Sequence, residues 1–120
     1  MVTHYINFGY PDTVMLALAG FDLEDTSPVT GVLRAIVIDS PSEFVGIACR
    51  INEKLVLPQE GEITIRTAIR YPINRNVTQK DRLVAALDNH DPINPHTPSL
   101  VWEIEEGAYE EELEEEISRR

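Results

Sequence analysis

The chain has 120 residues, 42% of them hydrophobic, a formal net charge of −11 and a single cysteine, Cys49. This length suits one domain with one core, and one cysteine excludes a scaffold stapled by intramolecular disulfides. No apolar run approaches the ~18–20 residues of a membrane span, and the acidity argues against direct binding to nucleic acid or to an anionic membrane. We therefore expect a cytoplasmic protein with no membrane segment.

The acidic residues concentrate near the end of the chain. Residues 103–116 include nine glutamates and no lysine or arginine, and only Arg119 and Arg120 follow with positive charge. Segments with like charge are typical of solvated tails or of surfaces that bind a basic partner. We predict a core domain over 1–106, followed by an acidic C-terminal helix or tail over 107–120.

The first elements are predicted from alternation and from turn residues. Val2, Ile6 and Phe8 share one face of a strand over 2–8, and a turn follows at 9–12. The apolar run 14–19 fits either a buried strand or a short helix. Residues 32–38 are apolar except for Arg34, which is typical of a central strand covered on both faces.

Two helices are predicted in the middle of the chain. Ser40 and Glu43 fit a capping box with Pro41 at the first helical position, which predicts a helix over 41–53. Its core-facing stripe would consist of Phe44, Ile47, Ala48 and Ile51. Thr78 and Asp81 give a weaker start for a second helix over 79–89, with Leu83, Val84 and Leu87 buried.

The remaining elements are strands and irregular segments. Residues 62–71 alternate as a strand, and 88–98 contain three prolines and should be irregular. A last strand is predicted over 99–104. This order predicts a single α+β domain with a mixed sheet of about five strands and two helices on one face. Residues 32–70 would form a right-handed βαβ crossover.

The acidic segment is the leading candidate for function. If it is helical, Tyr109, Leu113 and Ile117 form a narrow apolar stripe at i, i+4 and i+8. The sequence therefore predicts a small regulatory protein-binding module (an adaptor, an inhibitor or a subunit of an oligomer) that docks on a basic protein partner or on itself. A solvated helix, a frayed tail and a mimic of the nucleic-acid backbone remain alternatives. The predicted contact residues are Tyr109, Glu110, Glu111, Leu113, Glu114 and Ile117.

A basic stretch supports an alternative function. Between residues 66 and 82 there are five positive charges against Asp81 alone. Guanidinium groups bind oxyanions in a bidentate manner, so Arg66, Arg70 and Arg75 could hold a phosphate- or carboxylate-bearing ligand of a small-molecule binder or modest enzyme. The competing interpretation is that these arginines pair with glutamates of the acidic segment.

Residues with catalytic or metal-binding chemistry form no recognisable motif. Asp88, His90, Asp91 and His96 fall within nine positions, but their spacing matches no metal-site template and is equally compatible with turns. Cys49 lies in an apolar stretch and is expected to be a buried, inert thiol. We therefore predict no catalytic residue, no metal ligand and no cofactor.

Overall fold

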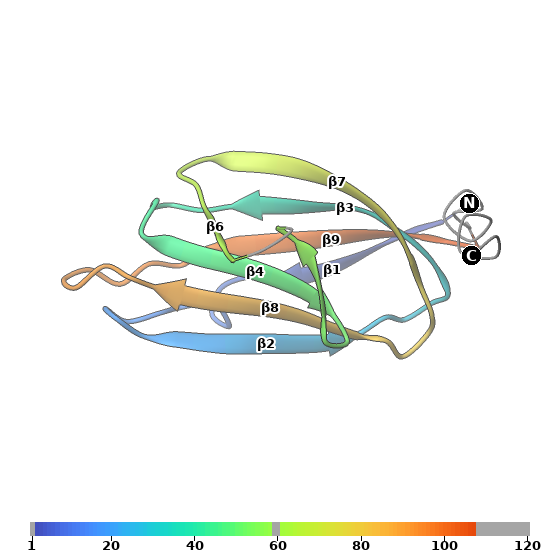
Figure 1. Ribbon diagram of the computed structural model, residues 1–120, viewed down its shortest axis with the longest axis horizontal. Helices are drawn as coiled ribbons and strands as arrows, with labels where there is room; N and C mark the ends of the chain where they lie inside the picture. The colour runs from blue at the N-terminus through green and yellow to red at the C-terminus, as the bar shows by residue number, and fades with distance from the viewer. Residues whose placement is uncertain (1, 59–60, 108–120) are drawn as a thin grey trace.

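The computed structural model describes residues 2–58 and 61–107, and in these residues it contains strands and no helix. Figure 1 shows the longer strands running roughly along the long axis of the molecule. The strands form two sheets, and every pairing between strands is antiparallel. The fold is therefore all-β, with the architecture of a sandwich. The strands are β1 (Thr3–Phe8), β2 (Gly20–Thr26), β3 (Gly31–Asp39), β4 (Val45–Ile51), β5 (Lys54–Leu57), β6 (Ile63–Thr64), β7 (Ala68–Val77), β8 (Arg82–Asn89) and β9 (Ser99–Glu106).

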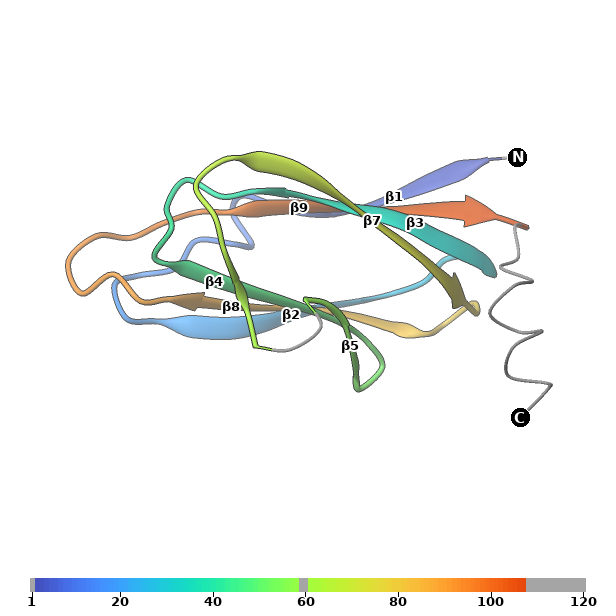
Figure 2. The same ribbon diagram turned by 45° about the horizontal axis from the view of Figure 1, so that its top comes forward.

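The strands form two sheets that face each other. The first sheet has the order β1-β9-β3-β7, and the second has the order β2-β8-β4-β5, with β6 also paired to β4. Figure 2 shows the two sheets as separate layers. Strands that follow one another in sequence often belong to different sheets, so the connections cross between the layers at both ends of the sandwich.

The core lies between the sheets and consists mainly of aliphatic side chains. Ile36 and Ile38 of β3 face Ile47 of β4 and Leu87 of β8 in one cluster of buried residues. Trp102 of β9 is fully buried there, and its ring meets that of Phe8 edge-on, with centroids 6.1 Å apart. Burial of each such side chain is worth roughly 1.5–3 kcal/mol, so this cluster is the main stabilising feature.

The helix predicted over 41–53 is wrong, because Val45–Ile51 form β4 and residues 52–53 are the turn that leads to β5. Val45, Ile47, Cys49 and Ile51 alternate toward the core, whereas Phe44 is 50% exposed. The expected cap is instead a turn: the Ser40 hydroxyl donates to the carbonyl of Ser42. The apolar residues of this segment fit both the 3.6-residue period of a helix and the 2-residue period of a strand. Hydrogen bonding of β4 to β8 decides in favour of the strand.

The helix predicted over 79–89 is also wrong, because β8 occupies Arg82–Asn89 at the centre of the second sheet. Leu83, Ala85 and Leu87 point into the core. The Asp81 carboxylate accepts hydrogen bonds from the N–H and hydroxyl of Thr78, so the predicted helix start is a tight turn. The α+β class is therefore replaced by an all-β class.

The predicted βαβ crossover is wrong as well. β3 and β7 are direct neighbours, and they are antiparallel. The strand expected over 62–71 is divided into β6 and the start of β7 by a bend at 65–67. Asn74 in β7 has a φ of 56°, next to the register shift between β7 and β3 at Leu33/Ala35, which is the backbone signature of a β-bulge.

Three strand predictions are confirmed, and one open question is answered. The strands expected over 2–8, 32–38 and 99–104 correspond to β1, β3 and β9. The run 14–19 is neither a helix nor a regular strand, because Met15 alone forms an isolated bridge with His96. Within the described residues, no helix of the length and apolarity needed to cross a membrane occurs.

The connections gather at two opposite ends of the sandwich. Residues 9–19, 40–44, 65–67 and 90–98 lie together at the left of Figure 1, and we call this the loop end. The turns at 27–30, 52–53 and 78–81 lie at the opposite end, where β9 leads to Gly107. The predicted contact residues of the acidic segment, Tyr109, Glu110, Glu111, Leu113, Glu114 and Ile117, lie outside the described residues.

Candidate functional site

The loop end carries most of the large apolar side chains that are exposed to solvent in the described residues. Tyr10 is 81% exposed, Ile93 79% and Leu16 69%. Charge is sparse in these four connections, where only Asp12, Glu43, Arg66 and Asp91 are formally charged. Exposed apolar side chains that gather at one end of a molecule are typical of a protein-interaction site. We call the exposed apolar residues of the loop end the apolar patch, and they are Tyr10, Val14, Leu16, Leu18, Phe44 and Ile93.

Backbone hydrogen bonds fasten the first loop to the last. The N–H of Met15 donates to the carbonyl of His96, and the N–H of His96 donates back to Met15, both at 3.0 Å. The N–H of Leu18 donates to the carbonyl of Asp91 at 3.1 Å. Met15 is fully buried. This anchor leaves Leu16 and Leu18, on either side of Ala17, directed at solvent.

The amide side chain of Asn89 holds the same loops from the inside. Asn89 is 2% exposed, and its Nδ2 donates to the carbonyls of Met15, Leu16 and Asn94 at 3.3, 3.1 and 2.9 Å. Its Oδ1 accepts the N–H of Asp91 at 3.0 Å. Buried backbone carbonyls need such partners, so this one side chain fixes where two loops leave the sandwich.

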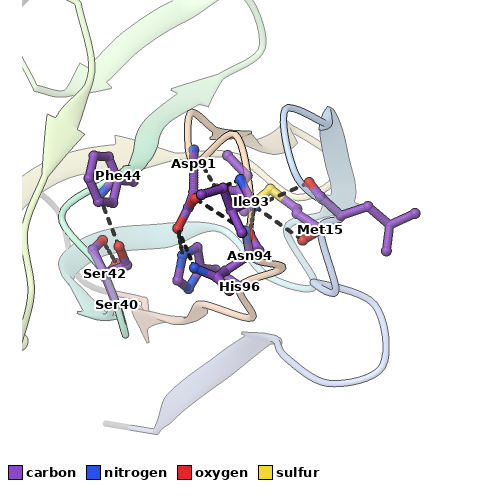
Figure 3. A network of polar contacts seen from close by, with 10 residues as sticks. Met15, Ser40, Ser42, Phe44, Asp91, Ile93, Asn94 and His96 are labelled. Atoms are coloured by element: carbon purple, nitrogen blue, oxygen red, sulfur yellow. Dashed lines mark hydrogen bonds and ion pairs between the residues drawn. The ribbon is translucent and has the colours of Figure 1, made fainter.

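Asp91 organises the loop that presents Ile93, as Figure 3 shows. One carboxylate oxygen accepts the N–H groups of Ile93 and Asn94, and the other contacts the Nε2 of His96 at 2.9 Å. These bonds, led by the one from His96, lower the pKa of Asp91 from 3.8 to about 2. The carboxylate therefore stays ionised over the whole neutral and mildly acidic range.

The third loop joins through Phe44. The N–H of Phe44 donates to the Ser42 hydroxyl, and its carbonyl accepts the N–H of His90 at 2.9 Å. A hollow of about 250 Å³ lies beside it, lined by Pro41, Ser42, Glu43, Phe44, Arg66, Asp91 and His96. The loop end thus combines protruding apolar side chains with one shallow polar hollow, and Arg66 is the positive charge in it.

The structure does not bring the three predicted arginines together. Arg66 lines the hollow at the loop end, whereas Arg70 projects from the outer face of the first sheet and pairs with Glu103 at 3.1 Å. Arg75 lies near the opposite end, in a cleft of about 670 Å³ that Lys54 and Arg82 also line. The backbone of Arg75 belongs to the β3–β7 ladder, but its side chain makes no hydrogen bond or ion pair with any other residue that the structure describes.

The histidine-rich segment splits into two separate groups. Asp91 and His96 form the structural pair of the loop end. Asp88 and His90 instead approach Glu62, which precedes β6. Sequence spacing could not find this second group, because Glu62 is 28 positions away from His90 and reaches it only through the pairing of β6 with β4.

Cys49 is buried in β4, as expected of an inert thiol. Burial raises its pKa to about 12, so the reactive thiolate form is suppressed at neutral pH. The residues missed by the sequence analysis are those of the loop end. The apolar run 14–19 fits a buried strand or a short helix, and neither interpretation predicts that Val14, Leu16 and Leu18 are exposed.

No family model matches this chain, and no curated protein matches it.

The pKa of Asp91 gives a testable pH dependence. Because the folded-state pKa is lower than the ordinary value of 3.8, the unfolded state binds more protons below about pH 4, and stability falls as the pH drops toward about 2. Asp91→Asn should lower the stability at pH 7 and flatten this acid-side loss, as measured by urea unfolding across a pH series. Asp12→Asn at the same end should leave the profile unchanged. An unaltered acid slope in Asp91→Asn would contradict this assignment.

Proposed function

We propose that this protein is a small acidic protein-binding module that docks on another protein through its loop end. The observation that carries the proposal is the concentration of exposed Leu16, Leu18, Ile93, Tyr10 and Phe44 in three loops that are hydrogen-bonded to one another. Preorganised apolar side chains bind with little loss of conformational entropy, which favours specific binding over nonspecific hydrophobic association.

The charge of the chain favours a basic partner. A second copy would bring two chains of net charge −11 together, and their repulsion opposes self-association through a small apolar tip. A partner that surrounds an apolar centre with lysine or arginine gains both burial and long-range attraction. We therefore assign as occupant a different protein with a basic rim and an apolar centre.

The acidic segment has a supporting role in this proposal. The described chain ends at the opposite end of the sandwich from the loop end. Glu110 and Glu114 follow this point in the sequence. Their charge would accelerate encounter with a basic partner, whereas the loop end would supply the contact that slows dissociation. Docking through Tyr109, Leu113 and Ile117, which the sequence predicts, is an alternative contact surface for the same protein-binding function.

A pair of matched variants tests the loop end. Leu16→Ser combined with Leu18→Ser removes two apolar side chains that are 69% and 68% exposed and should weaken partner binding at least about tenfold, because central apolar anchors dominate interfaces. The control, Val2→Ser combined with Tyr5→Ser, changes two residues that are each 59% exposed and lie away from the loop end. The partner is captured by cross-linking in host extract and purified, and its Kd for each variant is measured by calorimetry.

A third variant separates the two contact surfaces. Conversion of Glu110, Glu111, Glu112, Glu114, Glu115 and Glu116 to glutamine should slow association and reduce its salt dependence, with a smaller effect on dissociation. If this variant abolishes binding while the loop-end variant binds normally, the acidic segment is the docking surface and the loop-end proposal is wrong. Equal loss in the loop-end variant and its control would also contradict it.

The cleft around Arg75 favours a second candidate function, the binding of a small anion. Three cationic side chains, Lys54, Arg75 and Arg82, line it, against Glu53 and Asp81. Arg82 already pairs with Glu24 at 3.3 Å, and Asp81 is used by Thr78 and Asn52. The guanidinium of Arg75 is therefore the group best able to bind an oxyanion there.

Inorganic pyrophosphate is a suitable probe for this cleft. We expect it to shift backbone NMR signals around Asn52 and Arg75, and Arg75→Ala to lower the affinity at least about tenfold, because a charge-assisted pair is lost. Arg70→Ala is the control, since Arg70 already pairs with Glu103. Equal affinity of wild type and Arg75→Ala would eliminate the cleft as an anion site.

A further inference from the structure

Three metal-ligating side chains meet at the surface of the second sheet. Glu62, Asp88 and His90 are all exposed, and one potential ligand atom from each lies within 4.8 Å of the others. The closest pair is His90 Nε2 and Glu62 Oε1, at 2.6 Å. The set combines one imidazole nitrogen with two carboxylate oxygens from two segments that are far apart in the sequence.

Two glycines make room for these carboxylates. Asp88 is paired with Gly20 of β2 on one side and with Gly46 of β4 on the other. A Cβ atom added to Gly20 would overlap the Asp88 carboxylate, and one added to Gly46 would overlap the Glu62 carboxylate. The bare backbone on both sides of Asp88 therefore lets two acidic groups lie over the sheet and converge on His90.

We propose that Glu62, Asp88 and His90 form a binding site for a divalent transition-metal ion of the zinc class. Imidazole nitrogen and carboxylate oxygen are ligands that zinc, cobalt and nickel accept, whereas magnesium and calcium favour oxygen ligands alone. Three protein ligands at an exposed position leave room for water in the remaining coordination position. This inference is independent of the docking function proposed above.

The electrostatic surroundings favour a cation. Asp22 of β2 lies two residues from Gly20 and so shares the face that carries Asp88, adding negative charge nearby. The two carboxylates of the group are held close together at the surface, and a cation between them would relieve their repulsion.

The contact between His90 and Glu62 shows how the ion would enter. His90 Nε2 and Glu62 Oε1 lie 2.6 Å apart in a hydrogen bond. Metal binding would replace this hydrogen bond, and the side chains would move apart so that each ligand atom lies about 2.0–2.2 Å from the ion. Because all three side chains are exposed, this adjustment needs no rearrangement of the core.

A bound ion would act next to the loop end. The N–H of His90 donates to the carbonyl of Phe44, one of the exposed apolar residues there. Coordination would connect the segment before β6 to the end of β8, and so stiffen the support of the loop that carries Phe44.

Calorimetry with Zn²⁺ on the full-length, tag-free, chelator-treated protein tests the site. We expect one ion per chain at this site, with affinity that falls as the pH is lowered from about 8 to about 5.5, since protons compete for the imidazole. His90→Ala and Glu62→Gln should each weaken binding at least about tenfold. Cobalt(II) absorption provides a second readout, because inner-sphere coordination by His90 changes its visible bands.

His4→Ala is the matched control, because His4 is also a partly exposed histidine paired with a glutamate, Glu106, near the opposite end of the sandwich. It should bind Zn²⁺ like the wild type. The proposal is overturned if the wild type fails to bind, if His90→Ala and Glu62→Gln retain wild-type affinity, or if His4→Ala loses binding equally. Retained binding in His90→Ala would assign the ion to other acidic groups, since this variant keeps the complete acidic segment.

Discussion

The buried amide of Asn89 is the interaction on which the functional end of this molecule depends. Two N–H bonds of one side chain are shared among the carbonyls of Met15, Leu16 and Asn94, and its oxygen accepts the N–H of Asp91. Without it, several backbone groups would be buried unpaired, at about 1–3 kcal/mol each. Because these bonds set the path of both loops, the exposure of Leu16, Leu18 and Ile93 follows from them.

The three sites occupy separate regions of one sandwich. Exposed apolar side chains gather at the loop end, the cationic cleft around Arg75 lies near the other end, and Glu62, Asp88 and His90 lie on the surface of the second sheet. Elsewhere the outer face of the first sheet is neutralised internally, for example by Arg34 with Glu105 at 2.6 Å and Arg70 with Glu103. Although the chain is acidic overall, its surface therefore contains separate apolar, cationic and acidic regions.

Sequence reasoning succeeded where a pattern had one interpretation and failed where it had two. The alternation of Val2, Ile6 and Phe8 and the apolar run 32–38 predicted β1 and β3 correctly. Residues 41–53 and 79–89 contain apolar residues that satisfy both a 3.6-residue and a 2-residue period, and long-range pairing of β4 with β8 decided between them. The loop end could not be predicted because its geometry depends on Asn89, whose partners lie up to 74 positions away.

Amide hydrogen exchange of the wild-type protein, followed by NMR, tests the central claim most directly. If the loop end is a preorganised surface, the amides of Met15, Leu18 and His96, which are all hydrogen-bonded between loops, should exchange at least about a hundredfold more slowly than in an unstructured peptide. Protection at these three positions, comparable with that of neighbouring strand residues, is the result that the account predicts. Exchange at unstructured-peptide rates there, with the strands protected, would show that the loops are not fixed and would contradict it.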